Sequence, residues 1–273
     1  MEKILPIVFL LFFSSCRKEN LEINNLNNNK VCVFGHGGMG SEQIYPIDSY
    51  QSISKCLFVG ADGTEMDVQM TKDSVLVAFH DPDLSGKTNL EGTINSLTWS
   101  EIKDAKYATV PYADYKVVSL NELFDNIENI HNYIFSFDCK LYTVNSDLNQ
   151  FYDIFTRSID RLVNQYSLRE NVLIESTSAS FLKKFEILDN SYKLFYYPSS
   201  FEQGLKIATD WHFYGITIST EHITCSQVEI AHDNNLFVTV WGIHSRRGNT
   251  DAVAKNPDFI QTDRVKHLVK YLK

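Results

Sequence analysis

The chain has 273 residues, of which 44% are hydrophobic, and its formal net charge is −9. This composition is too apolar for a disordered protein and is sufficient for one large core or two small ones. No run of Lys or Arg exceeds two residues, and because binding to a phosphate backbone needs a basic face, a nucleic-acid partner is not expected.

The N-terminus has the pattern of an export signal. Residues 1–15, MEKILPIVFLLFFSS, place a lysine before an apolar run over residues 4–13. That run is too short to span a bilayer, which takes about 20 residues, and its length is typical of a secretory signal. The FSSC ending resembles a bacterial lipobox, so we expect lipidation at Cys16; an ordinary signal peptide cut nearby is the alternative. The expected location is the bacterial cell envelope, with the lipid as membrane anchor.

An Asn-rich stretch follows over residues 16–30. It has no period that would predict a helix or a strand, and we interpret it as a tether between the anchor and the fold. The folded domain is then expected over residues 31–273. The four cysteines within it form no CxxC pair, which indicates free thiols rather than a disulfide framework or a zinc site.

From residue 31 onward, short apolar runs alternate with amphipathic stretches. The expected strands are VCVFGH (31–36), TEMDVQM (64–70), VLVAFH (75–80), YIFSFDCK (133–140), NVLIES (171–176), KLFYYP (193–198), GITIST (215–220), FVTVWGI (237–243) and FIQTD (259–263). Stretches such as 201–211 and 226–235 are long enough to be crossover helices. This alternation is typical of βαβ units and a parallel sheet.

Eight such strands, with 75–80 as an additional hairpin partner, fit an α/β fold of the (β/α)8 TIM barrel type. A doubly wound open sheet is the competing arrangement. No linker interrupts the alternation, so we expect a single domain. Residues 82–118 lack a clear strand and are interpreted as an insertion over one end of the barrel.

Two carboxylates, Glu65 and Asp67, stand within an expected strand. Side chains alternate along a strand, so both point to the same face. Unpaired buried anions are strongly unfavourable, and a divalent cation at the barrel mouth would offset that penalty. A structural salt bridge is the other interpretation, although Lys72 is the only cation close in sequence.

Further polar residues end other expected strands. His36 ends the first strand and is followed by glycines, which allow a ligand to approach the backbone closely. His80 ends the hairpin strand, and Asp138 and Lys140 end the next. The C-terminal ends of the strands are where active sites form in (β/α)8 barrels.

Several segments together resemble the glycerophosphodiester phosphodiesterase family over about residues 31–265. They are HGG (36–38), GADGTEMDVQMTKDSVLVAFHD (60–81), FSFDCKL (135–141), VTVWGI (238–243) and PDFIQTD (257–263). The second segment follows the family's GAD-x-x-E-x-D signature and is the most specific part. The resemblance implies a barrel of the phospholipase C-like phosphodiesterase type, which uses a divalent metal to hydrolyse glycerophosphodiesters to an alcohol and glycerol 3-phosphate.

The resemblance also assigns roles to individual residues. The general acid and base would be His36 and His80, the ligands of Ca²⁺ or Mg²⁺ would be Glu65, Asp67 and Asp138, and the substrate would contact Lys140 and Trp241. Asp138 stands where the family has a glutamate. The metal would neutralise charge on a small phosphodiester, while one histidine takes a proton from the nucleophile and the other protonates the leaving alkoxide.

The chain departs from the family at two motifs. Where the family has H-R-G and P-E-N-T, this chain has HGG (36–38) and PIDS (46–49). Joint loss of the arginine and the glutamate is coherent if the two interact in other members, because losing one alone would leave an unpaired buried charge. Lys140, Lys87 or Arg246 could replace the arginine as a phosphate partner. Two alternatives follow: a phospholipase D-like lyase that forms a cyclic phosphate, and a degenerate barrel that binds phosphodiesters without turnover.

Overall fold

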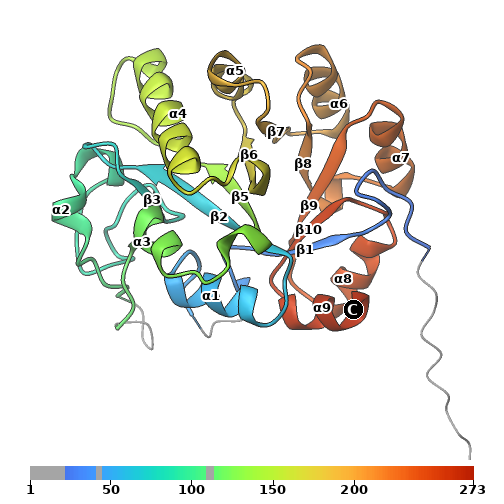
Figure 1. Ribbon diagram of the computed structural model, residues 1–273, viewed down its shortest axis with the longest axis horizontal. Coiled ribbons are helices and arrows are strands. Elements are labelled where there is room, and N and C mark those ends of the chain that lie inside the picture. The colour runs from blue at the N-terminus through green and yellow to red at the C-terminus, as the bar shows by residue number, and fades with distance from the viewer. Residues whose placement is uncertain (1–21, 41–44, 109–113) are drawn as a thin grey trace, which may run out of the picture.

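Eight parallel strands form a closed barrel in the computed structural model, which describes residues 22–40, 45–108 and 114–273 (Figure 1). The barrel strands are β1 (Cys32–Gly35), β2 (Gly63–Met70), β5 (Ile134–Cys139), β6 (Val172–Ser176), β7 (Lys193–Tyr196), β8 (Gly215–Ser219), β9 (Phe237–Ile243) and β10 (Phe259–Thr262). Their order is β1-β10-β9-β8-β7-β6-β5-β2, and β1 also pairs with β2. This closure confirms the (β/α)8 barrel and excludes the open sheet.

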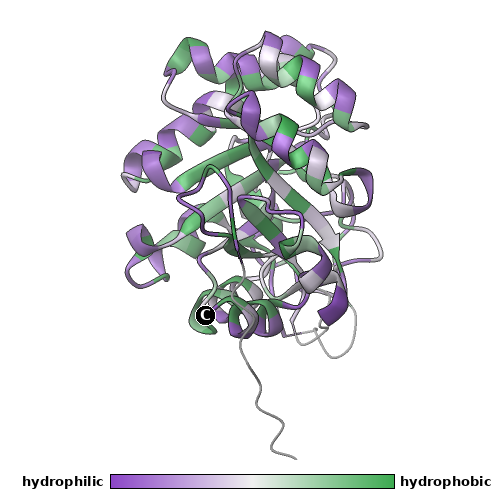
Figure 2. Cartoon of the chain, turned by 90° about the vertical axis from the view of Figure 1, so that its right-hand side faces the viewer, coloured by the Kyte–Doolittle hydropathy of each residue, from purple (hydrophilic) through white to green (hydrophobic). Residues whose placement is uncertain are grey.

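Helices surround the barrel and turn their apolar faces towards it, while their outer faces are polar (Figure 2). They are α1 (Tyr50–Phe58), α3 (Leu120–Asp125), α4 (Leu148–Gln165), α5 (Ala179–Leu188), α6 (Phe201–Asp210), α7 (Cys225–Asp233), α8 (Arg246–Val253) and α9 (Val265–Leu272). Most begin at a residue whose side-chain oxygen accepts a backbone N–H of the first turn. Examples are Ser49, Asp147, Ser200 and Thr224.

Residues 82–108 and 114–118 form a small lobe beside β3 (Leu76–Ala78), with the short helix α2 (Trp99–Ile102) at its outer edge (Figure 1). β3 pairs antiparallel with β2, which confirms the expected hairpin, and also with β4 (Val118–Ser119). β4 was not expected, because two residues are too few to show an alternating pattern. The lobe has an apolar core of its own, formed by Val77, Phe79, Leu84, Ile94, Ile102, Ala105 and Val117.

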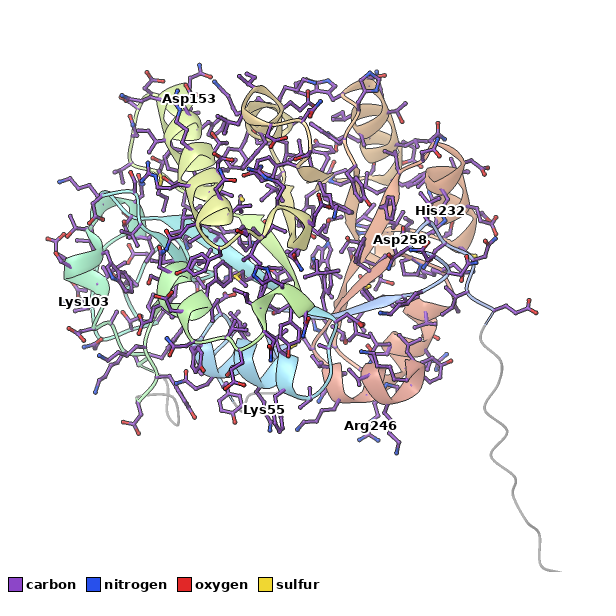
Figure 3. The ribbon with its side chains drawn as sticks, viewed as in Figure 1. Lys55, Lys103, Asp153, His232, Arg246 and Asp258 are labelled. Carbon is purple, nitrogen blue, oxygen red and sulfur yellow. The ribbon has the colours of Figure 1, made fainter. Side chains whose placement is uncertain are left out.

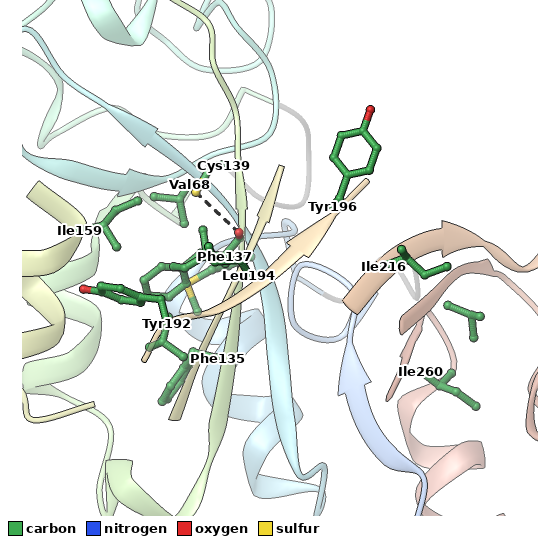
Figure 4. Packing of buried hydrophobic residues seen from close by; sticks show 14 of the residues in the cluster. Val68, Phe135, Phe137, Cys139, Ile159, Tyr192, Leu194, Tyr196, Ile216 and Ile260 are labelled. Atoms are coloured by element: carbon green, nitrogen blue, oxygen red, sulfur yellow. Dashed lines mark hydrogen bonds between the residues drawn. The ribbon is translucent and has the colours of Figure 1, made fainter. Parts of the chain in front are cut away.

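Alternation along the barrel strands separates the apolar side chains into two layers. The outer layer joins strands to helices; Val68, Phe135 and Phe137 lie in it with Ile159 of α4 (Figure 4). The inner layer contains strand residues and fills one end of the barrel interior. Its buried members are Cys32, Phe34, Leu173, Phe195 and Phe259.

A polar layer follows on the same interior face, two residues further towards the C-terminal ends of the strands. Ser136 donates a hydrogen bond to Glu175 at 2.6 Å, and the Gln261 amide donates to both Glu175 oxygens at 2.9 and 3.0 Å. Burial raises the pKa of Glu175 to about 7, although these hydrogen bonds act in the opposite direction. The interior is therefore apolar at the N-terminal ends of the strands and increasingly polar towards their C-terminal ends.

Part of the Asn-rich segment that we interpreted as a tether is fastened to the barrel. The Asn25 side chain donates to the carbonyl of Pro257 at 2.8 Å, and the Asn27 backbone N–H donates to Asp258 at 3.0 Å. Asp258 also pairs with His232 of α7 at 3.0 Å. Figure 3 labels both residues, which lie near the N-terminal ends of β9 and β10. Asn25 and Asn27 are thus fastened to the barrel, although they precede the expected start of the domain at residue 31.

The expected signal peptide and Cys16 lie outside the described residues. In the described part of the chain, none of the helices combines the length and the apolar character needed to cross a bilayer.

Candidate active site

Three carboxylates meet inside the barrel. Glu65 and Asp67 lie on β2, and the parallel register places Asp67 opposite Asp138 of β5. One oxygen of each residue lies within 4.8 Å of the other two, and Glu65 and Asp67 are almost fully buried. The expectation that both point to one face is confirmed, because Met66 and Val68 belong to the outer layer. Carboxylate oxygens are the donors that Ca²⁺ and Mg²⁺ prefer, so this donor set fits a divalent cation.

Lys140 partly neutralises the cluster. Its Nζ lies 2.8 Å from Asp67 Oδ1 and 2.7 Å from Asp138 Oδ2. Lys140 is distant from Asp67 in sequence but pairs with it from the neighbouring strand. The salt-bridge interpretation and the acidic cluster are therefore both present in the structure. One ammonium cannot balance three carboxylates, and burial together with the charge of Asp67 raises the pKa of Glu65 well above its usual value. The remaining negative charge favours a bound cation.

Asp48 adds a fourth carboxyl group. It is fully buried, and its Oδ1 accepts the backbone N–H of Asp67 at 3.0 Å. Its Oδ2 has no hydrogen-bond partner in the part of the chain that the structure describes. Burial and the charges of Asp67 and Glu65 raise the pKa of Asp48 well above its usual value. The sequence showed Asp48 only as part of an altered motif, and its contact with β2 is a long-range one.

His36 is held by Asp263, the residue after β10. Its Nδ1 lies 2.9 Å from Asp263 Oδ1, so Nδ1–H donates to the carboxylate and Nε2 is left for a ligand. Burial alone would lower the pKa of His36, but the hydrogen bond and charge of Asp263 raise it. The next residue, Gly37, donates its N–H to Glu65 at 2.8 Å, which places His36 beside the carboxylates. Sequence analysis missed Asp263, although its position at the end of an expected strand was a usable signal.

His80 lies just beyond β3 and is half-exposed. The preceding residue, Phe79, donates its N–H to the Asp67 carbonyl at 2.9 Å, so the turn that carries His80 starts beside the carboxylate cluster. His80 Nδ1 lies 3.6 Å from Asp81, which also pairs with Lys87 at 3.4 Å. Among the described residues, no hydrogen bond or ion pair joins His80 to the three carboxylates. Both histidines are thus tied to the cluster through a neighbouring residue, His36 through Gly37 and His80 through Phe79.

A pocket of about 660 Å³ opens beside Asp138 and Lys140, and Tyr142 and Tyr197 are among the side chains that line it. Trp241 of β9 lies next to this pocket, because its ring centre is 5.5 Å from that of Tyr197. The indole Nε1 of Trp241 is buried without a hydrogen-bond partner among the described residues. Such a pocket, with aromatic side chains on one side, fits a small polar ligand.

The two altered motifs touch each other. The family resemblance aligns Gly37 with the family's arginine and Ile47 with its glutamate. A Cβ added to Gly37 would lie 2.7 Å from the Ile47 Cβ, and Gly37 has a positive φ of 55°. Ile47 thus occupies space that a side chain at position 37 would need.

Comparison with known proteins relates the whole barrel to phosphodiesterases. Residues 39–267 match the sequence pattern of the Glycerophosphoryl diester phosphodiesterase family. The chain is 24% identical over 252 residues to the glycerophosphodiester phosphodiesterase of Caldanaerobacter subterraneus, a match that covers 89% of this chain and 98% of that protein. The Bacillus subtilis protein YqiK is 34% identical over 94 residues, which span 33% of this chain and 38% of that protein.

Solved structures show the same fold. A glycerophosphodiester phosphodiesterase from Parabacteroides distasonis is 22% identical with a TM-score of 0.73, covering 89% of this chain and 96% of that one. An Oleispira antarctica phosphodiesterase, solved in complex with the product sn-glycerol-3-phosphate, is 18% identical with a TM-score of 0.77, covering 88% and 96%.

Proposed function

Because the chain belongs to the glycerophosphoryl diester phosphodiesterase family, we propose that it hydrolyses glycerophosphodiesters to an alcohol and glycerol 3-phosphate. The observation that carries this proposal is the cluster of Glu65, Asp67 and Asp138, whose oxygens lie within 4.8 Å of one another. The Oleispira antarctica enzyme, which shares the fold, was solved with the same product, sn-glycerol-3-phosphate.

In this proposal, Glu65, Asp67 and Asp138 hold a Ca²⁺ or Mg²⁺ ion. The bound ion supplies positive charge that offsets the charge of the phosphodiester and polarises its phosphoryl group. Lys140 lines the pocket beside Asp138, so its ammonium can contact a phosphate oxygen. Trp241 and Tyr197 confine the organic part of the substrate.

His36 and His80 form the acid–base pair of the proposal. One accepts a proton from the attacking hydroxyl, and the other donates a proton to the departing alkoxide. Asp263 fixes the orientation of His36 and raises the pKa of that histidine, which favours the imidazolium and so the acid role. His80, on a more exposed turn, is then the base.

The test is product formation by the purified protein. Glycerophosphocholine and glycerophosphoethanolamine are incubated with Ca²⁺, Mg²⁺ or EDTA; glycerol 3-phosphate is measured in a coupled assay, and phosphorus NMR detects a cyclic phosphate. Metal-dependent glycerol 3-phosphate supports the hydrolase. A cyclic phosphate would instead identify the lyase, and binding without product would identify the degenerate barrel.

Variants test the residue roles. Glu65→Gln should abolish tight cation binding and activity, whereas His36→Ala and His80→Ala should each lower the rate by roughly 10²–10⁴. His131→Ala, an exposed histidine next to β5, is the control and should retain full activity. A nearly unaffected rate in either test variant would remove that histidine from the mechanism.

We also propose that the protein is exported and anchored through a lipid on Cys16. The support is the signal-like N-terminal sequence that ends in FSSC. Cys16→Ala should release the protein from the membrane fraction, and continued membrane association of this variant would contradict the anchor.

A further inference from the structure

A second cavity lies apart from the carboxylate cluster, between the start of α8 and the length of α9. It encloses about 870 Å³, and its charged and titratable lining residues are His244, Arg246, Arg264, Lys266, His267 and Lys270. We call these six residues the basic groove. His244 follows β9 directly, so the groove starts at the C-terminal ends of the strands, on the side of the barrel that carries the active site. Figure 3 shows Arg246 at the lower rim of the molecule, near α8 and α9.

The groove gathers positive charge in a chain whose formal net charge is −9. Among the residues that the structure describes, its lining contains four Arg or Lys residues and no Asp or Glu. Within the residues that the structure describes, no ion pair neutralises Arg246, Lys266 or Lys270. Like charges that line one concavity repel each other. A bound anion would offset this repulsion and accept charge-assisted hydrogen bonds from the cationic side chains.

Neutral contacts hold the wall of the groove in place. The buried Asn249 donates to His267 Nδ1 at 3.1 Å and to the carbonyl of Arg264 at 3.1 Å. His267 therefore carries its proton on Nε2, and its ring stacks on Tyr271 with 11° between the planes. The groove thus has a fixed aromatic wall with an N–H donor, in addition to its long cationic side chains.

Asp263 links the start of the groove to His36 through hydrogen bonds. His244 Nδ1 lies 2.5 Å from Asp263 Oδ2, and the other oxygen of Asp263 lies 2.9 Å from His36 Nδ1. The Arg264 guanidinium donates to the carbonyl of His244 at 3.0 Å, which ties the ends of β9 and β10 together. One carboxylate therefore separates the start of the groove from the residue that transfers a proton to substrate.

We infer that the basic groove binds a second anionic group of the substrate, carried on the alcohol side of the phosphodiester. The preferred substrate class would then be glycerophosphodiesters whose alcohol bears a further phosphate, rather than those with a cationic alcohol such as choline. This inference rests on the proposed function. A flat anionic membrane would call for a planar or convex basic face, whereas these residues line a concave one.

The test compares two substrates that differ by one phosphate, glycerophosphoinositol and glycerophosphoinositol 4-phosphate. The wild type should favour the 4-phosphate in kcat/KM, and Arg246→Gln/Lys270→Gln should reduce the ratio between the two substrates by about tenfold or more, since each lost contact is a charge-assisted hydrogen bond. Arg247→Gln/Lys103→Gln removes the same charge outside the groove and should leave the ratio unchanged. An equal ratio in the wild type and the groove variant would overturn the inference.

Binding separates this inference from the proposed function. Calorimetric titration of both compounds in EDTA should show tighter binding of the 4-phosphate, with the difference lost in the groove variant. If neither compound is hydrolysed under any condition but this difference persists, the hydrolase proposal fails and the anion site stands. If the groove variant loses only its attachment to phosphatidylserine vesicles in a sedimentation assay, the groove is a membrane contact and the inference is wrong.

Discussion

The resemblance aligns Gly37 and Ile47 with the family's arginine and glutamate, and a Cβ added to Gly37 would lie 2.7 Å from the Ile47 Cβ. Gly37→Arg alone should destabilise the protein by about 1–3 kcal/mol, because the new side chain meets Ile47 and the backbone has a positive φ. Gly37→Arg/Ile47→Glu should recover part of this loss, since a salt bridge replaces the clash. Thermal unfolding measures stability, and KM for glycerophosphocholine reports whether the arginine strengthens the hold on phosphate. Additive effects of the two substitutions would show that the positions are not coupled.

Glu175 is a second residue whose burial has a measurable consequence. Its pKa is raised to about 7, so the folded protein binds this proton more tightly than the unfolded chain does. The resulting stabilisation is complete below about pH 4.5 and is lost as the pH rises through 7, a loss on the order of 3 kcal/mol. In EDTA, urea unfolding of Glu175→Gln should therefore depend less on pH than that of the wild type. Glu128→Gln, on the surface, should follow the wild type, and parallel curves for Glu175→Gln would show that Glu175 does not titrate in this range.

At the scale of secondary-structure elements, the local sequence predicts most of the barrel. Each barrel strand is an apolar run of adequate length, and alternation alone predicts that Glu65 and Asp67 share a face. Contacts between distant segments could not be predicted in this way. Asp263, near the C-terminus, is hydrogen-bonded to His36, near the start of the barrel. Asp48, in the loop before α1, accepts the backbone N–H of Asp67. Such pairs depend on barrel closure, which only the three-dimensional arrangement shows.

The N-terminal segment gives a prediction at the same scale. Asn25 and Asn27 are hydrogen-bonded to Pro257 and Asp258, although the surrounding sequence predicts a linker. A chain that starts at residue 24 should melt like the full chain, whereas one that starts at residue 31 should melt about 5 °C lower, because about two net hydrogen bonds are lost. Calorimetry of both truncated forms checks this. Equal melting temperatures would mean that the segment contributes nothing to stability and acts as a tether.

For the whole molecule, the buried carboxylates link stability to cation binding. Glu65, Asp67, Asp138 and Asp48 lie together, and Lys140 pairs with Asp67 and Asp138. Only the folded barrel brings these residues together. A cation that binds the folded state alone stabilises it by about 2.7 kcal/mol at a concentration of 100 Kd, which corresponds to a rise of roughly 5–10 °C in Tm.

Glu65→Gln separates this effect from general damage to the fold. Without a cation, the variant should unfold at the same temperature as the wild type or higher, because one of several like charges is removed from a buried site. With Ca²⁺ or Mg²⁺, it should lose the rise in Tm that the wild type shows. Differential scanning fluorimetry in EDTA and in each cation measures both quantities. If the rise persists undiminished in Glu65→Gln, the stabilising cation binds elsewhere; if the variant melts far lower in EDTA, Glu65 serves the fold through its bond to Gly37 rather than a cation.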